Sequence, residues 1–372
     1  MAEESRPPKR ISTSERLWGL KWIARLVILV LVTWGIYHAV QRARHDLQIQ
    51  QDAWEADWKE LERRERDLGE GLDGPRRALW EEDRQRLISE RFDWWRISPA
   101  WIFAAGVLYV LGGVPCWLFW HQTLKALQQR PSPWGSLRAY WIGHLGKYVP
   151  GKALVVVLRA GLIRGPYVDG GIAAIAVFVE TLTMMAVGAT WSAILLYVSL
   201  DSDQQRTWLP WAILLAVCAG LPTLPPIFRW LVSFIQRRRG IEVSRELIAG
   251  IQTRRMAQGW VWMSLSWALM GLSLWATLRA FPGDSRTMVE SLADLPAIVA
   301  CAALAVVLGF VSLLPGGVGV RELVVVTLLT PLPNTGSAKA LAAALVVRVV
   351  WLLAEVLVST ILYTAPLLRR SR

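Results

Sequence analysis

Apolar stretches of membrane-spanning length recur along the chain, and they constrain its fold more than any other feature. Of the 372 residues, 54% are hydrophobic. A helix needs about 20 apolar residues to cross the hydrocarbon core, and only helices and closed barrels satisfy their backbone hydrogen bonds there. We therefore predict an all-α, polytopic membrane protein of about eight transmembrane helices, with re-entrant or broken helices among them. The predicted apolar segments are residues 18–40, 98–120, 169–200, 207–235, 258–281, 293–314, 318–332 and 338–367.

Two stretches do not fit simple crossings. The seventh segment, 318–332, is too short to cross easily, so we interpret it as half of a broken helix. The semi-apolar stretch 137–163 follows the second segment and is either re-entrant or a ninth element. With eight crossings, it would enter and leave on the cytoplasmic side.

Basic residues predict the orientation of the chain. Lys and Arg gather before the first segment, after the second and fourth, and after the last, whereas the loop 201–206 carries Asp201 and Asp203. Cytoplasmic loops are enriched in Lys and Arg, so we expect a multi-pass protein of a bacterial-type cytoplasmic (inner) membrane with both termini cytoplasmic. The net charge of +12 has the same explanation, because anionic lipid faces these loops. We expect no nucleic-acid partner.

Residues 41–97 form a separate piece rich in Glu, Asp and Arg. One apolar stripe repeats every seven residues, at Leu47, Trp54, Leu61 and Leu68. A Gly-rich break ends at Pro75, which is placed to open a second helix. We predict an extracytoplasmic amphipathic helical hairpin that serves as a spacer or self-association element, or alternatively handles substrate. The predicted domains are 1–40, a cytoplasmic N-terminus with the first transmembrane helix; 41–97, the hairpin; and 98–372, the transmembrane domain.

A first candidate site lies in the glycine-rich run from Gly143 to Lys152. Here Pro150-Gly151 is placed to open a helix whose free N–H groups and positive dipole end would face an anion. Lys147, Lys152 and Arg159 would add positive charge, and phosphate is the natural ligand. The alternative is a basic cytoplasmic turn that only sets topology.

A second candidate site, Leu313 to Glu322, interrupts an apolar run with Pro315-Gly316-Gly317 and Gly319, followed by Arg321 and Glu322. Unwound backbone and charge at membrane depth persist only inside protein or beside a water-filled cavity. Paired interruptions in two halves of a chain indicate a midplane site in transporters. Chance is the alternative, because a chain with 28 Gly and 19 Pro can carry two Pro-Gly pairs by coincidence; no internal repeat is obvious in the sequence.

Other ionisable residues inside apolar segments are few. Glu180 is alone between Asp169 and Asp201, and Arg348 and Glu355 share the last segment. The latter two lie seven residues, or roughly 10 Å, apart along a helix, so each needs a partner on another helix. These charges are either functional or a structural ion network.

No pattern indicates catalysis or a metal site. The cysteines lack a CxxC pair, and the histidines, His144 among them, lack metal-ligand spacing and are interpreted as interfacial or loop residues. Ser, His and Asp are not arranged as a nucleophile with its base. We predict no cofactor, no metal and no catalytic residue.

The two glycine-rich motifs resemble those of the lysylphosphatidylglycerol synthase transmembrane-region family, the flippase-like membrane domain of multiple peptide resistance factor proteins. The resemblance covers roughly 98–367 and implies a polytopic helical domain that handles charged lipids and moves them between leaflets. Arg348 matches an Arg common in the family's last segments. By motif match, the lipid site would include Pro150, Gly151, Lys152, Arg159, Pro315, Gly316, Gly317, Gly319, Arg321 and Glu322.

The chain also departs from the family pattern. Many members carry Glu-Arg followed shortly by Asp in a middle segment, whereas here Glu180 is followed by Thr181. That difference argues against a charge relay. The chain ends just after its last apolar segment without the soluble aminoacyl-transferase domain, so we do not expect synthase activity.

The leading hypothesis is therefore a membrane protein that binds and translocates a phospholipid or a polyprenyl-phosphate-linked lipid. One alternative is a membrane transferase with a lipid-linked donor, for which Glu180 and Glu322 are the candidate carboxylates. Another is a scaffold that acts through residues 41–97. A homo-oligomer is left open.

Overall fold

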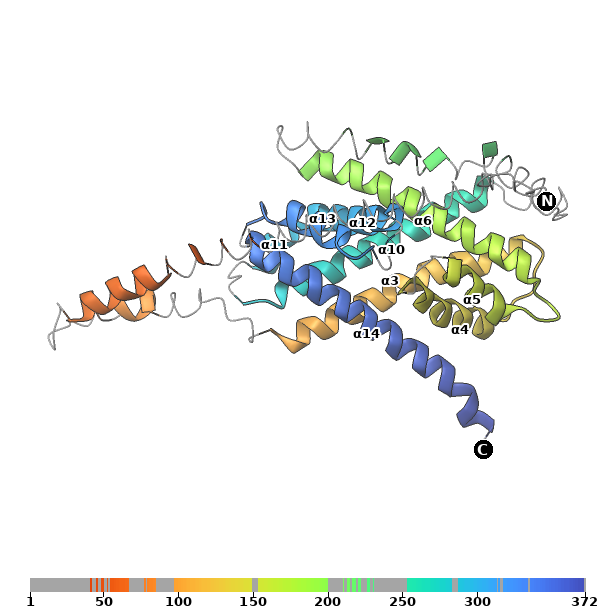
Figure 1. Cartoon of the computed structure of the whole chain (residues 1–372), viewed down its shortest axis with the longest axis horizontal. Coiled ribbons are helices and arrows are strands. Elements are labelled where there is room, and N and C mark those ends of the chain that lie inside the picture. The colour runs from red at the N-terminus through yellow and green to blue at the C-terminus, as the bar shows by residue number, and fades with distance from the viewer. Residues whose placement is uncertain are drawn as a thin grey trace, which may run out of the picture.

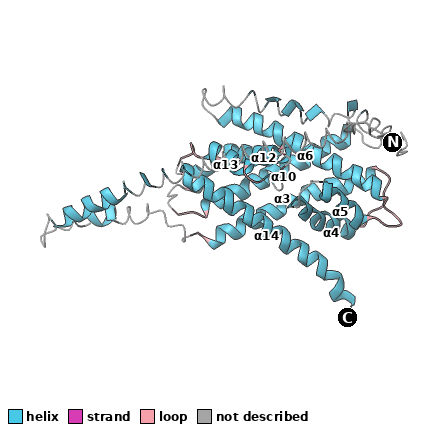
Figure 2. Ribbon diagram, in the orientation of Figure 1, coloured by secondary structure: helices cyan, strands magenta, loops and turns pink. Residues whose placement is uncertain are grey.

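The fold is helical, as predicted. The computed structural model describes residues 97–148, 153–199, 253–282, 287–312, 317–333 and 335–370, residue 314, and scattered positions within 41–84 and 210–230. Within these residues there is no strand, only an isolated bridge between Gly165 and Val168. Figure 2 shows the helices and the loops that join them. The predicted segment 18–40 and most of 207–235 lie outside the described residues.

Five helical stretches among the described residues are long and apolar enough to cross a membrane. They are α3 (Pro99–Ala126), α6 (Gly170–Ser199), α10 (Thr253–Arg279), the stretch Met288–Val311 that contains α11 (Met288–Leu292) and α12 (Leu295–Val311), and the apolar part Gly336–Ala365 of α14 (Gly336–Arg370). They correspond to the second, third, fifth, sixth and eighth predicted segments. The chain is therefore a multi-pass membrane protein.

The helices α3 and α10 form an antiparallel pair at the centre of the fold (Figure 1). Ser266 donates a hydrogen bond to the carbonyl of Gly112 at 2.7 Å, and Ser273 donates to that of Ala105, also at 2.7 Å. A Cβ at Gly259 would lie 2.5 Å from the Phe119 ring. Small residues and serine hydroxyls let helices approach closely in membranes, where the hydrophobic effect does not draw them together.

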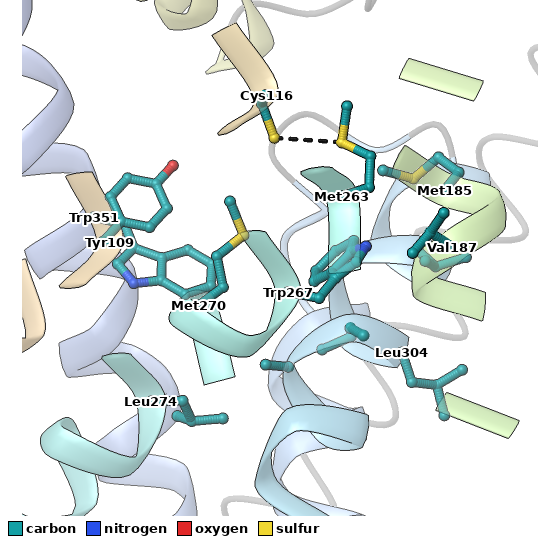
Figure 3. Close-up of a cluster of buried hydrophobic side chains, with 14 of the residues drawn as sticks. Tyr109, Cys116, Met185, Val187, Met263, Trp267, Met270, Leu274, Leu304 and Trp351 are labelled. Carbon is teal, nitrogen blue, oxygen red and sulfur yellow. Dashed lines mark hydrogen bonds between the residues drawn. The ribbon is translucent and has the colours of Figure 1, made fainter. Parts of the chain in front are cut away.

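Large side chains fill the core around this pair. Figure 3 shows Cys116 of α3 against Met263 of α10, with 3.5 Å between their sulfurs. The Tyr109 and Trp351 rings stack at 4.6 Å, which joins α3 to α14. Trp267 of α10 donates from its indole nitrogen to the Met184 carbonyl of α6 at 3.0 Å. The core therefore fixes α6 and α14 on the central pair.

The stretch 137–163 is a re-entrant hairpin. It comprises α4 (Pro133–His144), the short 3-10 helix η2 (Leu145–Tyr148) and α5 (Ala153–Ile163). Helices of 12 and 11 residues reach only about 18 Å, short of the ~30 Å core. Its two ends meet, because Arg130 N donates to the Tyr167 carbonyl at 3.1 Å and Asp169 N donates to Gln129 Oε1 at 2.8 Å. We name this unit the first hairpin.

The predicted seventh segment, 318–332, belongs to a second hairpin. Its arms are α12 and the ten-residue α13 (Val320–Leu329), which run antiparallel. A Cβ at Gly309 of α12 would lie 2.9 Å from Arg321 Cγ in α13, while at the other end Ile298 and Leu332 line one small cavity. The seventh segment is thus the short arm of a hairpin, as its length indicated.

The two hairpins make the fold an inverted repeat, which the sequence did not reveal. Each half consists of a long helix, a hairpin and a second long helix: α3, α4–α5, α6, and then α10, α12–α13, α14. The helix contacts of one half have counterparts in the other. Within the halves, α5 packs on α6 as α13 packs on α14. Between the halves, α4 packs on α14 as α12 packs on α6, and α3 packs on α14 as α10 packs on α6. Because the equivalent helices α3 and α10 are antiparallel, the hairpins enter from opposite ends (Figure 1).

Parts of the predicted extramembrane hairpin are also helical. Residues 54–66 form a helix with Trp54 stacked on Trp58 at 5.3 Å. Exposed ion pairs such as Lys59–Glu55 line its surface. Figure 1 shows this helix standing apart from the membrane helices. The predicted boundaries at 40 and 97 remain predictions.

Candidate functional site

The described ends of the two hairpins face the same region of the fold, beside α3, α6 and α14. The Arg321 guanidinium, at the tip of the second hairpin, lies within Coulombic range of His144, Lys147 and Tyr148 at the tip of the first. We name this region the tip junction. The charged side chains in and beside it are Lys147, Arg159, Glu180, Arg321, Glu322, Arg348 and Glu355.

Arg159 of α5 is buried and anchors the first hairpin to α6. Its Nη1 donates to Glu180 Oε2 at 2.9 Å, and its Nη2 donates to His144 Nδ1 at 2.8 Å. The guanidinium carbon lies 4.0 Å from the centroid of the Tyr140 ring, whose hydroxyl donates to Glu180 Oε1 at 3.5 Å. Burying a guanidinium without such a partner would destabilise the fold.

Glycines allow the two arms of the first hairpin to pass this closely. A Cβ at Gly143 would lie 2.5 Å from Arg159 Cγ and 2.9 Å from its backbone nitrogen. A Cβ at Gly146 would lie 2.8 Å from the Val155 nitrogen. The glycines of this motif therefore leave the space that Arg159 and the backbone of α5 occupy.

Glu355 of α14 receives the tip of the first hairpin. Its side chain is fully buried, and its Oε1 accepts hydrogen bonds from Lys147 of η2 and Tyr109 of α3. Lys147 also donates to the Tyr109 hydroxyl at 3.2 Å. His144 Nε2 lies 3.7 Å from the same carboxylate oxygen. The tip is thus held by one ion pair to a long helix.

His144 connects this group to Arg159. Because a guanidinium only donates, Nδ1 accepts the Arg159 bond and Nε2 carries the proton. That Nε2–H faces Glu355.

In the second hairpin, Glu322 pairs with Arg348 of α14. Glu322 Oε2 also accepts a hydrogen bond from the Gly319 nitrogen at 2.6 Å, which caps the start of α13. Gly319 has φ +84 and Gly317 has φ +66, values that favour glycine. The carboxylate therefore fixes both the unwound turn and its attachment to α14.

Arg321 differs from the other charges of the tip junction. No described residue accepts a hydrogen bond from its guanidinium or forms an ion pair with it. Its Nε is buried without a hydrogen-bond partner, as is the Nε of Arg159, but the Nη groups of Arg159 are bonded. Its side chain packs on the bare backbone of Gly309 and Gly317, where added Cβ atoms would lie 2.9 and 3.0 Å from Nε.

The structure brings together most of the predicted site residues. Pro150, Gly151, Lys152, Pro315 and Gly316 lie outside the described residues. The others, Lys147, Arg159, Gly317, Gly319, Arg321, Glu322, Arg348, Glu180 and Glu355, lie at the hairpin tips or on the helices that they contact.

Sequence reasoning missed three neutral residues of this region. Tyr109 and Tyr140 are embedded in helices, and nothing in the sequence distinguishes them from core aromatics. The interpretation of His144 as an ordinary loop or interfacial residue was wrong, because it lies between Arg159 and Glu355. Its spacing of three from Lys147, on one face of a helical turn, was the available signal.

These motifs and helices correspond to one known family. A family model described as lysylphosphatidylglycerol synthase TM region matches residues 86–359. The chain belongs to this family. The match begins within the predicted 41–97 piece and includes both hairpins, and the family is a membrane domain with a lipid-related role. No curated protein matches the chain.

Proposed function

We propose that the tip junction binds the phosphate of a lipid headgroup and carries it across the membrane while the acyl tails stay in lipid. The substrate class is a phospholipid or a polyprenyl-phosphate-linked lipid. Membership of a lipid-related membrane family supports this proposal.

The observation that carries the proposal is that the Arg321 guanidinium forms no hydrogen bond and no ion pair with any described residue. The described charges of the site comprise four cations and three carboxylates, which leaves one positive charge. Each carboxylate has a cation of its own: Lys147 holds Glu355, Arg159 holds Glu180, and Arg348 holds Glu322. A half-buried cation with no countercharge among the described residues is costly, and an anionic phosphate that accepts from a planar guanidinium would lower that cost.

The inverted repeat supports translocation beyond binding alone. Repeats of opposite orientation with a site between them allow rocking of one half against the other, which exposes the site to each side in turn. Here the hairpins enter from opposite ends, so each tip would line the path to one leaflet.

The transferase alternative is less well supported. Its candidate carboxylates, Glu180 and Glu322, each form an ion pair with an arginine, and Glu322 also caps α13, so both have a structural role. The scaffold role of residues 41–97 remains a separate prediction.

Lipid movement in proteoliposomes tests the proposal. Fluorescent phosphatidylglycerol labelled on an acyl chain is incorporated, and dithionite quenches whatever reaches the outer leaflet. We expect quenching beyond the outer-leaflet fraction for the wild type and its loss for Arg321→Gln. Arg321→Gln should leave the apparent Tm within a few degrees, because no described residue depends on this guanidinium for an ion pair.

Two matched controls distinguish the loss of the proposed phosphate site from the loss of any one positive charge and from lipid movement that does not need the site. Arg164→Gln removes an exposed arginine on the loop after α5 and should move lipid like the wild type. An equally labelled diacylglycerol, which lacks phosphate, reports movement that does not depend on the site. If Arg321→Gln moves phosphatidylglycerol as fast as the wild type, the tip junction is not the phosphate site.

A further inference from the structure

Glu355 is the most deeply buried of the three carboxylates in and beside the tip junction. Its Oε1 contacts Lys147 and Tyr109, but its Oε2 is buried and has no hydrogen-bond partner among the described residues. The groups that face it come from every element packed around it. They are Tyr109 of α3, His144 of α4, and Lys147 and Tyr148 of η2, while the charges of Arg321 of α13 and Arg348 of α14 lie near Tyr148.

Among these groups, Lys147 is the one cation that forms an ion pair with Glu355. His144 accepts a hydrogen bond from Arg159 on Nδ1, so its ring is neutral, and Arg348 is paired with Glu322. Lys147 is also the more exposed member of the pair: its side chain is 21% exposed, whereas that of Glu355 is 0% exposed. A lysine ammonium is a compact charge on a flexible stem, so it can change partners.

A phosphate on Arg321 would compete with Glu355 for Lys147, because Arg321 and Lys147 are close enough for their charges to interact. If Lys147 turned to the phosphate, Glu355 would be left as a buried anion with only neutral donors. A carboxylate in that position takes up a proton rather than remain charged. Its free Oε2 is the atom available to bear it.

We propose that the protein couples lipid movement to protons through an exchange of partners by Lys147. This inference rests on the proposed function. When the headgroup phosphate binds, the Lys147 ammonium moves from the Glu355 carboxylate to the phosphate, and one hydronium ion gives its proton to Glu355 and becomes water. When the phosphate leaves, Lys147 returns and the proton is released. One negative charge and one proton therefore cross together, without net charge.

Two measurements on the full chain test the coupling. In detergent, short-chain phosphatidylglycerol is added to purified protein in weakly buffered solution with a pH indicator dye. The wild type should take up about one proton per bound lipid, as linkage between the two ligands requires, and Glu355→Gln should take up none. In proteoliposomes, an imposed pH gradient should accelerate lipid movement toward the alkaline side in the wild type only.

The controls keep this result separate from the proposed function. If the wild type binds and moves lipid with no proton uptake and no response to the gradient, the coupling is wrong although the phosphate site stands. If neither lipid binding nor movement occurs, the proposed function itself fails. Proton uptake that persists in Glu355→Gln and disappears in His144→Asn would overturn the assignment to Glu355.

Folding and ligand source need their own controls. Because Glu355→Gln leaves Lys147 unpaired, the double variant Lys147→Met/Glu355→Gln checks folding, and it too should show no proton uptake. Inorganic phosphate alone distinguishes the two sources of the anion. Uptake with inorganic phosphate equal to that with lipid would overturn the requirement for a lipid.

Discussion

Removing one partner of the buried pair between Arg159 and Glu180 should destabilise the first hairpin more than most single substitutions. The two side chains are 2% and 3% exposed, and a bond of 2.9 Å joins them. Glu180→Gln keeps the shape but removes the negative charge, so it leaves a buried guanidinium without a counterion. Breaking a buried pair in this way costs about 3–5 kcal/mol.

The same reasoning predicts that removing both charges is much less harmful. In Arg159→Met/Glu180→Leu no buried charge is left, and apolar side chains of similar volume can pack on Tyr140. Replacement of a whole buried pair is often close to neutral, so we expect the double variant to lose at most about 1–2 kcal/mol. The two single variants and the double variant form a thermodynamic cycle.

Thermal unfolding in detergent, followed by the fluorescence of the many tryptophans, measures these differences. For a domain of this size, Glu180→Gln should lower the apparent Tm by on the order of 10 °C. Lys59→Met, which breaks the exposed Lys59–Glu55 pair, should leave it unchanged, because exposed pairs contribute little. The reasoning is refuted if Glu180→Gln shifts the Tm no more than Lys59→Met, or if the double variant is less stable than either single one.

Three further outcomes follow from the geometry. Gly143→Ala should destabilise the protein by about 1–3 kcal/mol, because its Cβ would meet the Arg159 backbone, whereas Gly161→Ala in α5, with nothing within 4 Å, should be neutral or slightly stabilising; unequal Tm values check this. Gly317→Ala should abolish lipid movement in proteoliposomes, because it combines a φ of +66 with a Cβ 2.8 Å from the Gly309 Cα. Arg348→Gln should lower the Tm, and Arg348→Lys should recover part of it, since a cation again faces Glu322; equal Tm values for the two variants would contradict the ion pair.

The helices and the position of the site could be predicted because the membrane imposes simple rules. Apolar length located the described spanning helices, and the cost of charge and unwound backbone at membrane depth pointed to both glycine-rich motifs. The requirement that Arg348 and Glu355 find partners on other helices was also correct, because seven residues along one helix separate them too far for direct contact.

The choice of partners could not be predicted, because it depends on how the helices pack. Lys147 was interpreted as part of a phosphate-binding turn, yet it also neutralises Glu355. Because Lys147 pairs with Glu355, Arg321 is the cation of the site without an ion pair among the described residues. A count of the charges in the sequence does not reveal this.

The inverted repeat was hidden for a related reason. In the first half, an arginine of the short arm pairs with a glutamate of the next long helix, as Arg159 does with Glu180. In the second half the polarity is reversed, since Glu322 lies on the short arm and Arg348 on the long helix. Packing and ion pairing are kept while residue identities are exchanged, so the repeat is visible only in three dimensions.

A structure determined by cryo-electron microscopy in nanodiscs rich in phosphatidylglycerol tests the central claim most directly. We predict density for a headgroup phosphate at the tip junction, about 3 Å from the Arg321 guanidinium, as a charge-assisted hydrogen bond requires, and absent from Arg321→Gln under the same conditions. A wild-type tip junction closed by protein side chains alone, with ordered lipid only on the outer surface of the helices, would contradict the account.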